Sequence, residues 1–339
     1  MKTLLALLPI ALTISVLAST HTLAQEPKAP SYHLLTKVAV GGEGAWDYLT
    51  VDSDAHRLYV TRSTHVMVMD SNTNKLVGDI TNTPGVHGVA LAPKLGRGFI
   101  SNGRENTVLV FDLKTLKEIQ RIPVGKNPDA ILYDPATNRV FTFNGTSNDV
   151  TALDATTGKV LATIPAGGKP EFAVTDEKGM VYFNVEDTSE LLAMDAKGLK
   201  IKSRWKIAPG EEASGLAFDK AHRHLFAVCG NEKMAVVDAD SGKVLATPTI
   251  GKGPDAAAFD AKQNLAFSSN GADGTLTLVE TKTFKAIGTV PTQTGARTLT
   301  IDPKTGKLYL ISAKFKPAEP GQRRPSMEPG SAVILVYGR

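Results

Sequence analysis

Seven polar residues recur along the chain at intervals of 40 to 43 residues, a spacing that could gather them at one site. They are Asp47, His87, Asp129, Glu171, Ser214, Asp255 and Arg297. Four carboxylates, an imidazole and a guanidinium in one place could bind a metal ion or a small polar ligand. Crowded carboxylates would raise one another's pKa values unless a cation or Arg297 offset their charge. A solvated rim without a ligand is the alternative, because polar residues are common in loops.

The elements that would position these residues repeat with the same period. Each of the seven lies five positions before the end of a short apolar run, which usually ends at an aspartate. The terminal residues are Asp52, Ala92, Asp134, Asp176, Asp219, Asp260 and Asp302. A second series of acidic residues, from Asp70 to Glu280, repeats with nearly the same spacing. A tandem period of this length indicates one structural unit used seven times.

Each repeat contains four short runs rich in Val, Ile, Leu, Phe and Tyr, separated by Gly, Asn, Asp and Pro, which is typical of antiparallel strands. One such sheet cannot bury both of its faces, whereas sheets stacked around an axis can. The sequence therefore predicts an all-β protein, a seven-bladed β-propeller of four-stranded antiparallel blades. The last repeat has only three strands, over 298–302, 307–312 and 332–337. We expect residues 33–40 to complete this blade and close the ring.

The N-terminal segment differs in composition from the repeats. Lys2 is followed by an apolar run over 4–17 and then by small and polar residues, which is typical of a secretory signal peptide over 1–24. The run is shorter than the roughly 20 residues that a membrane span needs, and no later stretch is uniformly apolar. We expect an exported protein, periplasmic or secreted, without a transmembrane segment in the mature chain. A lead-in at 25–32 would precede a single propeller domain over 33–339.

The composition argues against several classes of protein. Of the 339 residues, 42% are hydrophobic, which is enough for a large core. The formal net charge of +4 lacks the concentrated basic excess of a dedicated nucleic-acid binder. Cys229 is the only cysteine, so an intramolecular disulfide cannot form, and the missing Cys-x-x-Cys-His motif argues against a haem protein. We expect a monomer.

Several strands have a shared pattern that points to a known family. The strands in question are Leu58–Thr61, Phe141–Asn144, Tyr182–Asn184, Val236–Asp238 and Gly242–Thr247. With them, the chain resembles the YVTN family of β-propeller repeats, which includes exported YncE-like proteins. The resemblance covers essentially the whole mature chain and implies an exported seven-bladed propeller, often in the periplasm or at the cell surface. It implies no particular activity, because the scaffold serves binding as well as catalysis.

The last repeat carries a Pro-rich, basic insertion at about 313–330, where the other repeats have short turns between their second and third strands. In an up-and-down blade, this connection lies on the same face as the one that leads into the innermost strand. The insertion should therefore lie beside Arg297. We expect a lid in which Lys316, Arg323 and Arg324 cover an acidic mouth. A tolerated surface insertion is the alternative.

These patterns favour a non-enzymatic propeller that binds a protein partner or a small polar ligand at the mouth of its central channel. A divalent metal ion such as Ca²⁺ could take part, held by Asp129, Glu171 and Asp255. The first alternative is a lactonase-type hydrolase, in which some of the mouth carboxylates, Asp47 included, hold a metal that polarises a carbonyl or activates water. His87 would then carry the proton and Arg297 would hold an anionic substrate. A nucleic-acid-binding propeller is the second alternative, less favoured because the mouth is acidic and poor in aromatic residues.

Overall fold

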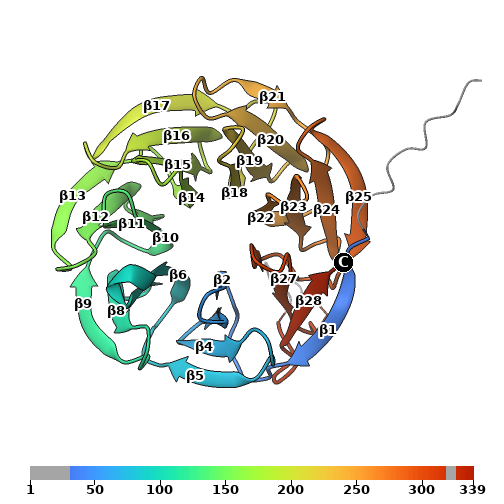
Figure 1. Cartoon of the computed structure of the whole chain (residues 1–339), viewed down its shortest axis with the longest axis horizontal. Helices are drawn as coiled ribbons and strands as arrows, with labels where there is room; N and C mark the ends of the chain where they lie inside the picture. The colour runs from blue at the N-terminus through green and yellow to red at the C-terminus, as the bar shows by residue number, and fades with distance from the viewer. Residues whose placement is uncertain (1–30, 318–325) are drawn as a thin grey trace, which may run out of the picture. The chain divides into compact units, whose positions relative to one another are not determined.

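Seven four-stranded antiparallel sheets surround a central axis in the computed structural model, which describes residues 31–317 and 326–339 (Figure 1). This confirms the predicted seven-bladed propeller. In those residues the one helix is a short 3-10 turn, η1 (Pro93–Leu95), and no helix is long and apolar enough to cross a membrane. The predicted signal peptide over 1–24 and most of the lead-in lie outside the described residues.

The first four blades follow the chain, with each strand paired to the next from the innermost to the outermost. Blade 1 comprises β2 (Leu49–Asp52), β3 (Arg57–Arg62), β4 (His65–Asp70) and β5 (Leu76–Ile80). Blade 2 comprises β6 (Val86–Ala92), β7 (Arg97–Asn102), β8 (Thr107–Asp112) and β9 (Glu118–Pro123). Blade 3 comprises β10 (Pro128–Asp134), β11 (Arg139–Asn144), β12 (Asp149–Asp154) and β13 (Val160–Pro165). Blade 4 comprises β14 (Pro170–Thr175), β15 (Met180–Val185), β16 (Glu190–Asp195) and β17 (Lys200–Lys206).

The last three blades have the same order, and the seventh takes its outermost strand from the start of the chain. Blade 5 comprises β18 (Ala213–Asp219), β19 (His224–Cys229), β20 (Lys233–Asp238) and β21 (Val244–Ala246). Blade 6 comprises β22 (Pro254–Asp260), β23 (Leu265–Asn270), β24 (Thr275–Glu280) and β25 (Lys285–Pro291). Blade 7 comprises β26 (Leu299–Ile301), β27 (Leu308–Ser312), β28 (Val333–Gly338) and β1 (His33–Ala39).

The ring closes by antiparallel pairing of β1 with β28, as the sequence predicts. The register runs from His33 opposite Gly338 to Ala39 opposite Val333, and Figure 1 shows β1 at the outer edge beside β28. Tyr32, just before β1, is buried, and its hydroxyl donates to Asp260 Oδ2 at 3.0 Å. Both chain ends therefore contribute to the same blade.

The hydrophobic core lies between neighbouring blades. Phe143 of blade 3 meets Phe183 of blade 4 with ring centroids 5.1 Å apart. Middle strands such as β15 are almost fully buried, because a neighbouring blade covers each of their faces. The outer strand β17 instead alternates exposed and partly buried residues. This difference explains why the middle strands are continuous apolar runs in the sequence.

The recurring aspartates have a structural role at the ends of the strands. The Asp134 carboxylate accepts hydrogen bonds from the backbone N–H and the hydroxyl of Thr137, at 3.0 and 2.6 Å. Asp154 accepts the same pair of bonds from Thr157, at 2.7 and 2.9 Å. A side chain that bonds to the backbone two or three residues later fixes a tight turn. The acidic period of the sequence therefore reflects turn geometry.

Removal of β1 should open the ring. A chain that begins at Val40 lacks the outer strand of blade 7 and the Tyr32–Asp260 hydrogen bond. We expect it to lose a large part of the roughly 5–15 kcal/mol by which a folded domain is typically stable. Urea unfolding measures this loss, with a chain that begins at Ser31 as the control. Equal unfolding midpoints for the two chains would contradict the role of β1.

Candidate functional site

The seven predicted residues occupy equivalent places at one end of the inner strands, here called the mouth. His87, Asp129 and Glu171 are the second residues of β6, β10 and β14, and Ser214 and Asp255 hold that place in β18 and β22. The remaining two come two residues before an inner strand, Asp47 before β2 and Arg297 before β26. All inner strands run in the same direction, so these places share one end of the channel.

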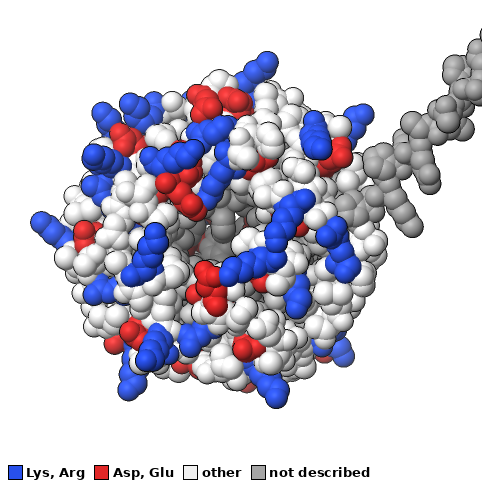
Figure 2. All heavy atoms as spheres, in the orientation of Figure 1, with Lys and Arg blue, Asp and Glu red and all other residues white. Residues whose placement is uncertain are grey.

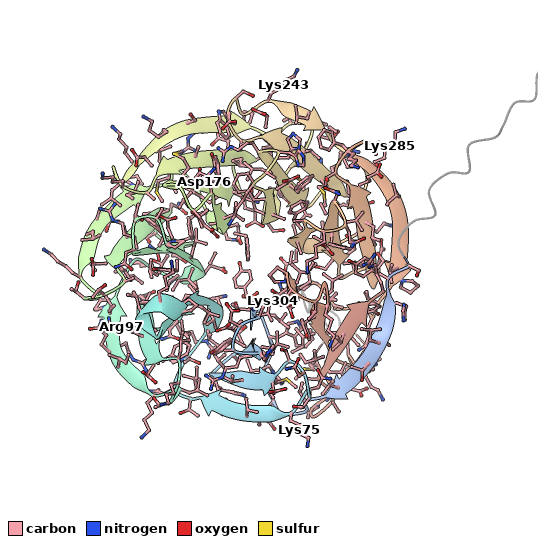
Figure 3. The ribbon with its side chains drawn as sticks, viewed as in Figure 1. Lys75, Arg97, Asp176, Lys243, Lys285 and Lys304 are labelled. Carbon is pink, nitrogen blue, oxygen red and sulfur yellow. The ribbon has the colours of Figure 1, made fainter. Side chains whose placement is uncertain are left out.

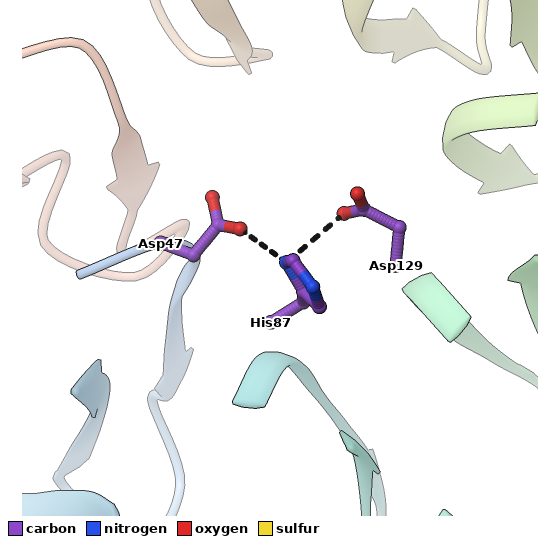
Figure 4. A group of neighbouring side chains, drawn as sticks. All are labelled: Asp47, His87 and Asp129. Atoms are coloured by element: carbon purple, nitrogen blue, oxygen red, sulfur yellow. Dashed lines mark hydrogen bonds and ion pairs between the residues drawn. The ribbon is translucent and has the colours of Figure 1, made fainter. Parts of the chain in front are cut away.

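Five of the seven mouth residues form a continuous series of alternating charge. Arg297 pairs with Asp255 and lies 3.7 Å from Asp47 Oδ1. Asp47 Oδ2 is 2.6 Å from His87 Nδ1, which is 3.6 Å from Asp129 Oδ1 (Figure 4). Each cation therefore lies between two carboxylates of neighbouring blades.

The other two mouth residues stand apart from this series. Glu171 pairs with Lys169 at 2.7 Å, and Lys169 also pairs with Glu186 in the adjacent loop. Ser214 contributes its backbone carbonyl, which accepts a hydrogen bond from Asn184 Nδ2 at 2.9 Å. Sequence reasoning missed Lys169, which precedes the repeated position by two residues.

Tyr48 spans the channel just beneath the mouth, and sequence reasoning missed it. Its hydroxyl donates to Asp129 Oδ1 of blade 3 at 3.1 Å, and its ring lies 5.3 Å from that of Phe172 in blade 4. The equivalent residue in blade 2 is Gly88, where a Cβ atom would come within 3.2 Å of the Tyr48 ring. The sequence did contain a signal for it. At the position that follows each mouth residue, only blades 1 and 4 carry an aromatic residue.

Burial and charge perturb the basic and phenolic groups of the mouth. Burial would lower the pKa of His87, but its hydrogen bonds to Asp47 and Asn127 and the charge of Asp129 raise that pKa to about 9. Burial and the surrounding carboxylates raise the pKa of Tyr48 well above its usual value. At neutral pH the imidazole is therefore cationic and the phenol keeps its proton.

The carboxyl groups shift toward their protonated forms. Burial and the charge of Asp129 raise the pKa of Glu171 to about 8, which the Lys169 ammonium only partly offsets. Burial raises the pKa of Asp255 to about 6 despite the Arg297 guanidinium. Burial also raises the pKa of Asp129. Perturbed groups of this kind cluster at functional sites.

A pocket of about 770 Å³ opens between blades 6, 7 and 1 beside the mouth, and we call it the side pocket. Trp46, Phe315 and Met327 supply its apolar wall, while Asp255 and Arg297 supply its polar groups. The Trp46 and Phe315 rings lie 6.1 Å apart. The side pocket therefore joins an apolar wall to two members of the charged series.

The stem of the predicted lid reaches the side pocket. Phe315 and Met327 face each other in an isolated antiparallel bridge, and the Lys316 N–H donates to the Ser326 carbonyl at 2.8 Å. The Lys316 side chain is exposed and does not line the pocket. Arg323 and Arg324, the other two expected lid residues, lie outside the described residues. The described part of the insertion thus contributes apolar residues to the side pocket, and the basic lid stays a prediction.

A buried arginine holds the loop that presents Trp46 and Asp47. Arg62 is fully buried, and its guanidinium donates to the carbonyls of Gly41, Glu43 and Gly44 at 2.9 to 3.3 Å. Burial lowers its pKa. Five N–H donors in a fixed fork suit such a set of carbonyls, so Arg62 orders the loop before blade 1.

A possible metal set differs from the predicted one. Among the described residues, the group of His, Cys, Asp and Glu side chains with ligand atoms within 4.8 Å of one another is Asp47, His87 and Asp129. Of the predicted ligands Asp129, Glu171 and Asp255, only Asp129 belongs to it. The other two carboxylates instead pair with cations, Glu171 with Lys169 and Asp255 with Arg297.

Comparisons with known proteins assign the chain to a family. The family model described as the cytochrome D1 heme domain matches residues 51–263, and the chain belongs to this family. Among solved structures, one titled Kuenenia stuttgartiensis Hydrazine Synthase matches with a TM-score of 0.68 and 15% identity, over 82% of this chain and 94% of that one. At that identity the likeness shows the fold alone. No curated protein matches, and the resemblance to the YVTN repeat family stays a prediction.

The family name raises the question of haem, since the missing Cys-x-x-Cys-His motif bears only on covalent attachment. Haem iron needs a protein ligand. His87 is at the mouth, but its Nδ1 bonds to Asp47 and its ring also hydrogen-bonds to Asn127. Met327 lines the side pocket. The polar groups of that pocket, Arg297 and Asp255, are already paired with each other. Both ring nitrogens of His87 are therefore engaged, and no histidine is among the described residues that line the side pocket, so these residues do not fit a histidine-ligated haem.

The raised pKa of Glu171 predicts a pH-dependent stability. Below about pH 4.5 the carboxyl is protonated in both the folded and the unfolded chain. As the pH rises to about 8, the unfolded chain ionises while the folded one retains its proton, so the free energy of unfolding falls. Glu171→Gln should remove this contribution, a difference on the order of a few kcal/mol between pH 5 and pH 8, and leave the slopes that the raised pKa values of His87 and Asp255 produce.

Chemical denaturation across this pH range measures the slope. Glu186→Gln is the matched control, because Glu186 also pairs with Lys169. We expect the control to keep the wild-type slope. Parallel curves for wild type and Glu171→Gln would show that Glu171 ionises freely in the folded protein.

Proposed function

We propose that this protein is a ligand-binding propeller whose side pocket takes a small organic molecule with an apolar body and an anionic head. One observation carries the proposal: the same 770 Å³ pocket contains Trp46, Phe315 and Met327 on one side and the Asp255–Arg297 pair on the other. Ligand pockets in proteins typically combine apolar walls with a few convergent polar groups.

Arg297 is the group that would receive the head of the ligand. It donates to Asp255 and to the Trp46 carbonyl at 3.2 Å, which leaves donor capacity on its planar fork. Its side chain is 28% exposed, so a ligand can reach it. A ligand carboxylate would compete with Asp255, and protonation of Asp255 would favour the ligand. Anion binding should therefore strengthen as the pH falls through about 6.

Naphthalene-2-carboxylate is a suitable probe, because Trp46 fluorescence reports on the pocket and Trp205→Phe removes the only other tryptophan. We expect quenching that saturates, with an affinity that rises from pH 7.5 to pH 5.5. Asp255→Asn should bind tightly at both pH values. Arg297→Gln should weaken binding about tenfold or more, the loss expected for a charge-assisted hydrogen bond.

Arg121→Gln is the matched control, because Arg121 pairs with Glu105 and Glu118 in blade 2, away from the pocket. Its affinity should equal that of the wild type. Unchanged binding in Arg297→Gln would place the anion elsewhere and refute the proposed role of the pocket.

A metal-assisted hydrolase is the second candidate, favoured by the Asp47–His87–Asp129 group. A divalent ion there would replace the proton that His87 Nδ1 shares with Asp47 and would offset the repulsion between the carboxylates. It could then polarise a carbonyl or activate water. This candidate and the binding proposal use neighbouring parts of the mouth, so one protein could have both.

Metal binding predicts stabilisation by added ions. Zn²⁺ or Ca²⁺ should raise the melting temperature of chelator-treated protein, and Asp129→Asn should abolish the rise together with any lactone turnover. Glu171→Gln is the control, because Glu171 lies outside the three-residue group. Equal melting temperatures with and without each ion would eliminate the metal candidate.

We also propose that the mature protein works outside the cytoplasm. The support is the composition of residues 1–24, a basic residue followed by a short apolar run. N-terminal sequencing of the protein from its native compartment tests this proposal. A start near Gln25 is expected, and a start at Met1 would contradict it.

A further inference from the structure

A second cavity lies on the other side of Tyr48 from the mouth. It has a volume of about 570 Å³, receives residues from the inner strands of all seven blades, and reaches the turns that follow those strands. We call it the inner channel. Figure 2 shows a hollow at the centre of this face, and in the same view Figure 3 labels Lys304, from one of these turns, near the centre.

The walls of the inner channel are largely apolar. Side chains that line it include Val51, Leu91, Tyr133, Phe172, Phe259 and Ile301, all partly exposed. Apolar surface in contact with water costs roughly 25 cal/mol per Å², and an apolar ligand would remove that cost. Contiguous exposed apolar surface of this kind marks binding sites.

The far end of the inner channel is aromatic. Phe172 lines the channel and packs against Tyr48, whose hydroxyl contacts Asp129. Beyond these rings lie the mouth residues, whose carboxylates alternate with His87 and Arg297. Lys220, the one Lys or Arg among the residues that line the channel, is at the opposite end, so a ligand with an anionic group would keep its charge at the open face.

Lysines at the open face could receive that charge. Lys220 lines the channel and pairs with Glu177, and Lys304 pairs with Asp54. Lys262 Nζ donates to the Lys304 backbone carbonyl at 2.6 Å. Glu177 and Asp54 are largely exposed, and exposed ion pairs contribute little, so an anion can displace the carboxylates.

We propose that the inner channel binds a long-chain carboxylate of the fatty-acid class, with its apolar chain against the inner strands and its carboxylate at Lys220. Apolar walls, an aromatic far end and a lysine at the opening together define this orientation. The site is separate from the side pocket, with which it shares no lining residue.

The fluorescent fatty acid cis-parinarate tests the proposal on the mature chain. We expect saturable binding that dodecanoate displaces and that octanoate and dodecanol displace less well. Thr300→Phe, which would fill the channel from β26, should weaken binding about tenfold or more. Ala257→Leu, a smaller change in β22, should weaken it in the same direction if Thr300→Phe proves unstable.

Charge reversal at the opening supplies the second arm. Lys220→Glu should weaken parinarate binding, while Lys285→Glu on the outer strand β25 should not. Trp46→Ala, in the side pocket, should also leave it unchanged. Absence of saturable binding would overturn the proposal. So would binding that survives Thr300→Phe and Ala257→Leu in folded protein, or that is lost in Trp46→Ala.

Discussion

The need to cover both faces of every blade determines the rest of this structure. A middle strand such as β15 is buried on each side only if a neighbouring blade is present on each side, so the sheets must form a closed ring. The β1–β28 pairing meets this requirement with strands from both ends of the chain. Closure then places the seven inner strands around one axis, all running in the same direction. Side chains 250 residues apart in sequence, Asp47 and Arg297, therefore lie 3.7 Å apart.

The alternation of charges reduces the repulsion between the carboxylates of the mouth. Four carboxylates at one end of a channel would repel one another, but His87 and Arg297 each separate two of them. The arrangement still leaves Glu171 and Asp255 with raised pKa values, because burial outweighs the neighbouring cations. The ion pairs therefore hold the mouth side chains in place. The protonation of Asp255 and Glu171 changes at about pH 6 and about pH 8.

The period of the sequence was sufficient to predict the blades, their number and the closing strand, because each blade repeats the same turns and apolar runs. It also located the seven mouth residues, since equivalent positions converge on one axis. It could not reveal Lys169 or Phe315, because each occurs in a single blade or insertion and has no counterpart in the repeat. Tyr48 has one aromatic counterpart, Phe172, but the spacing does not show that the two rings meet across the channel. The expected metal ligands differed for a related reason, since the pairing of Asp255 with Arg297 depends on side-chain geometry that spacing does not encode.

The aromatic barrier of Tyr48 and Phe172 has a consequence for transport. A propeller with an open bore would let ions and solutes diffuse from one surface to the other. Here Tyr48 reaches across the bore to Asp129 and Phe172, so a solute would meet two aromatic rings between the mouth and the inner channel. The side pocket and the inner channel share no lining residue, so a substitution in one can change what that cavity binds and leave the lining of the other intact.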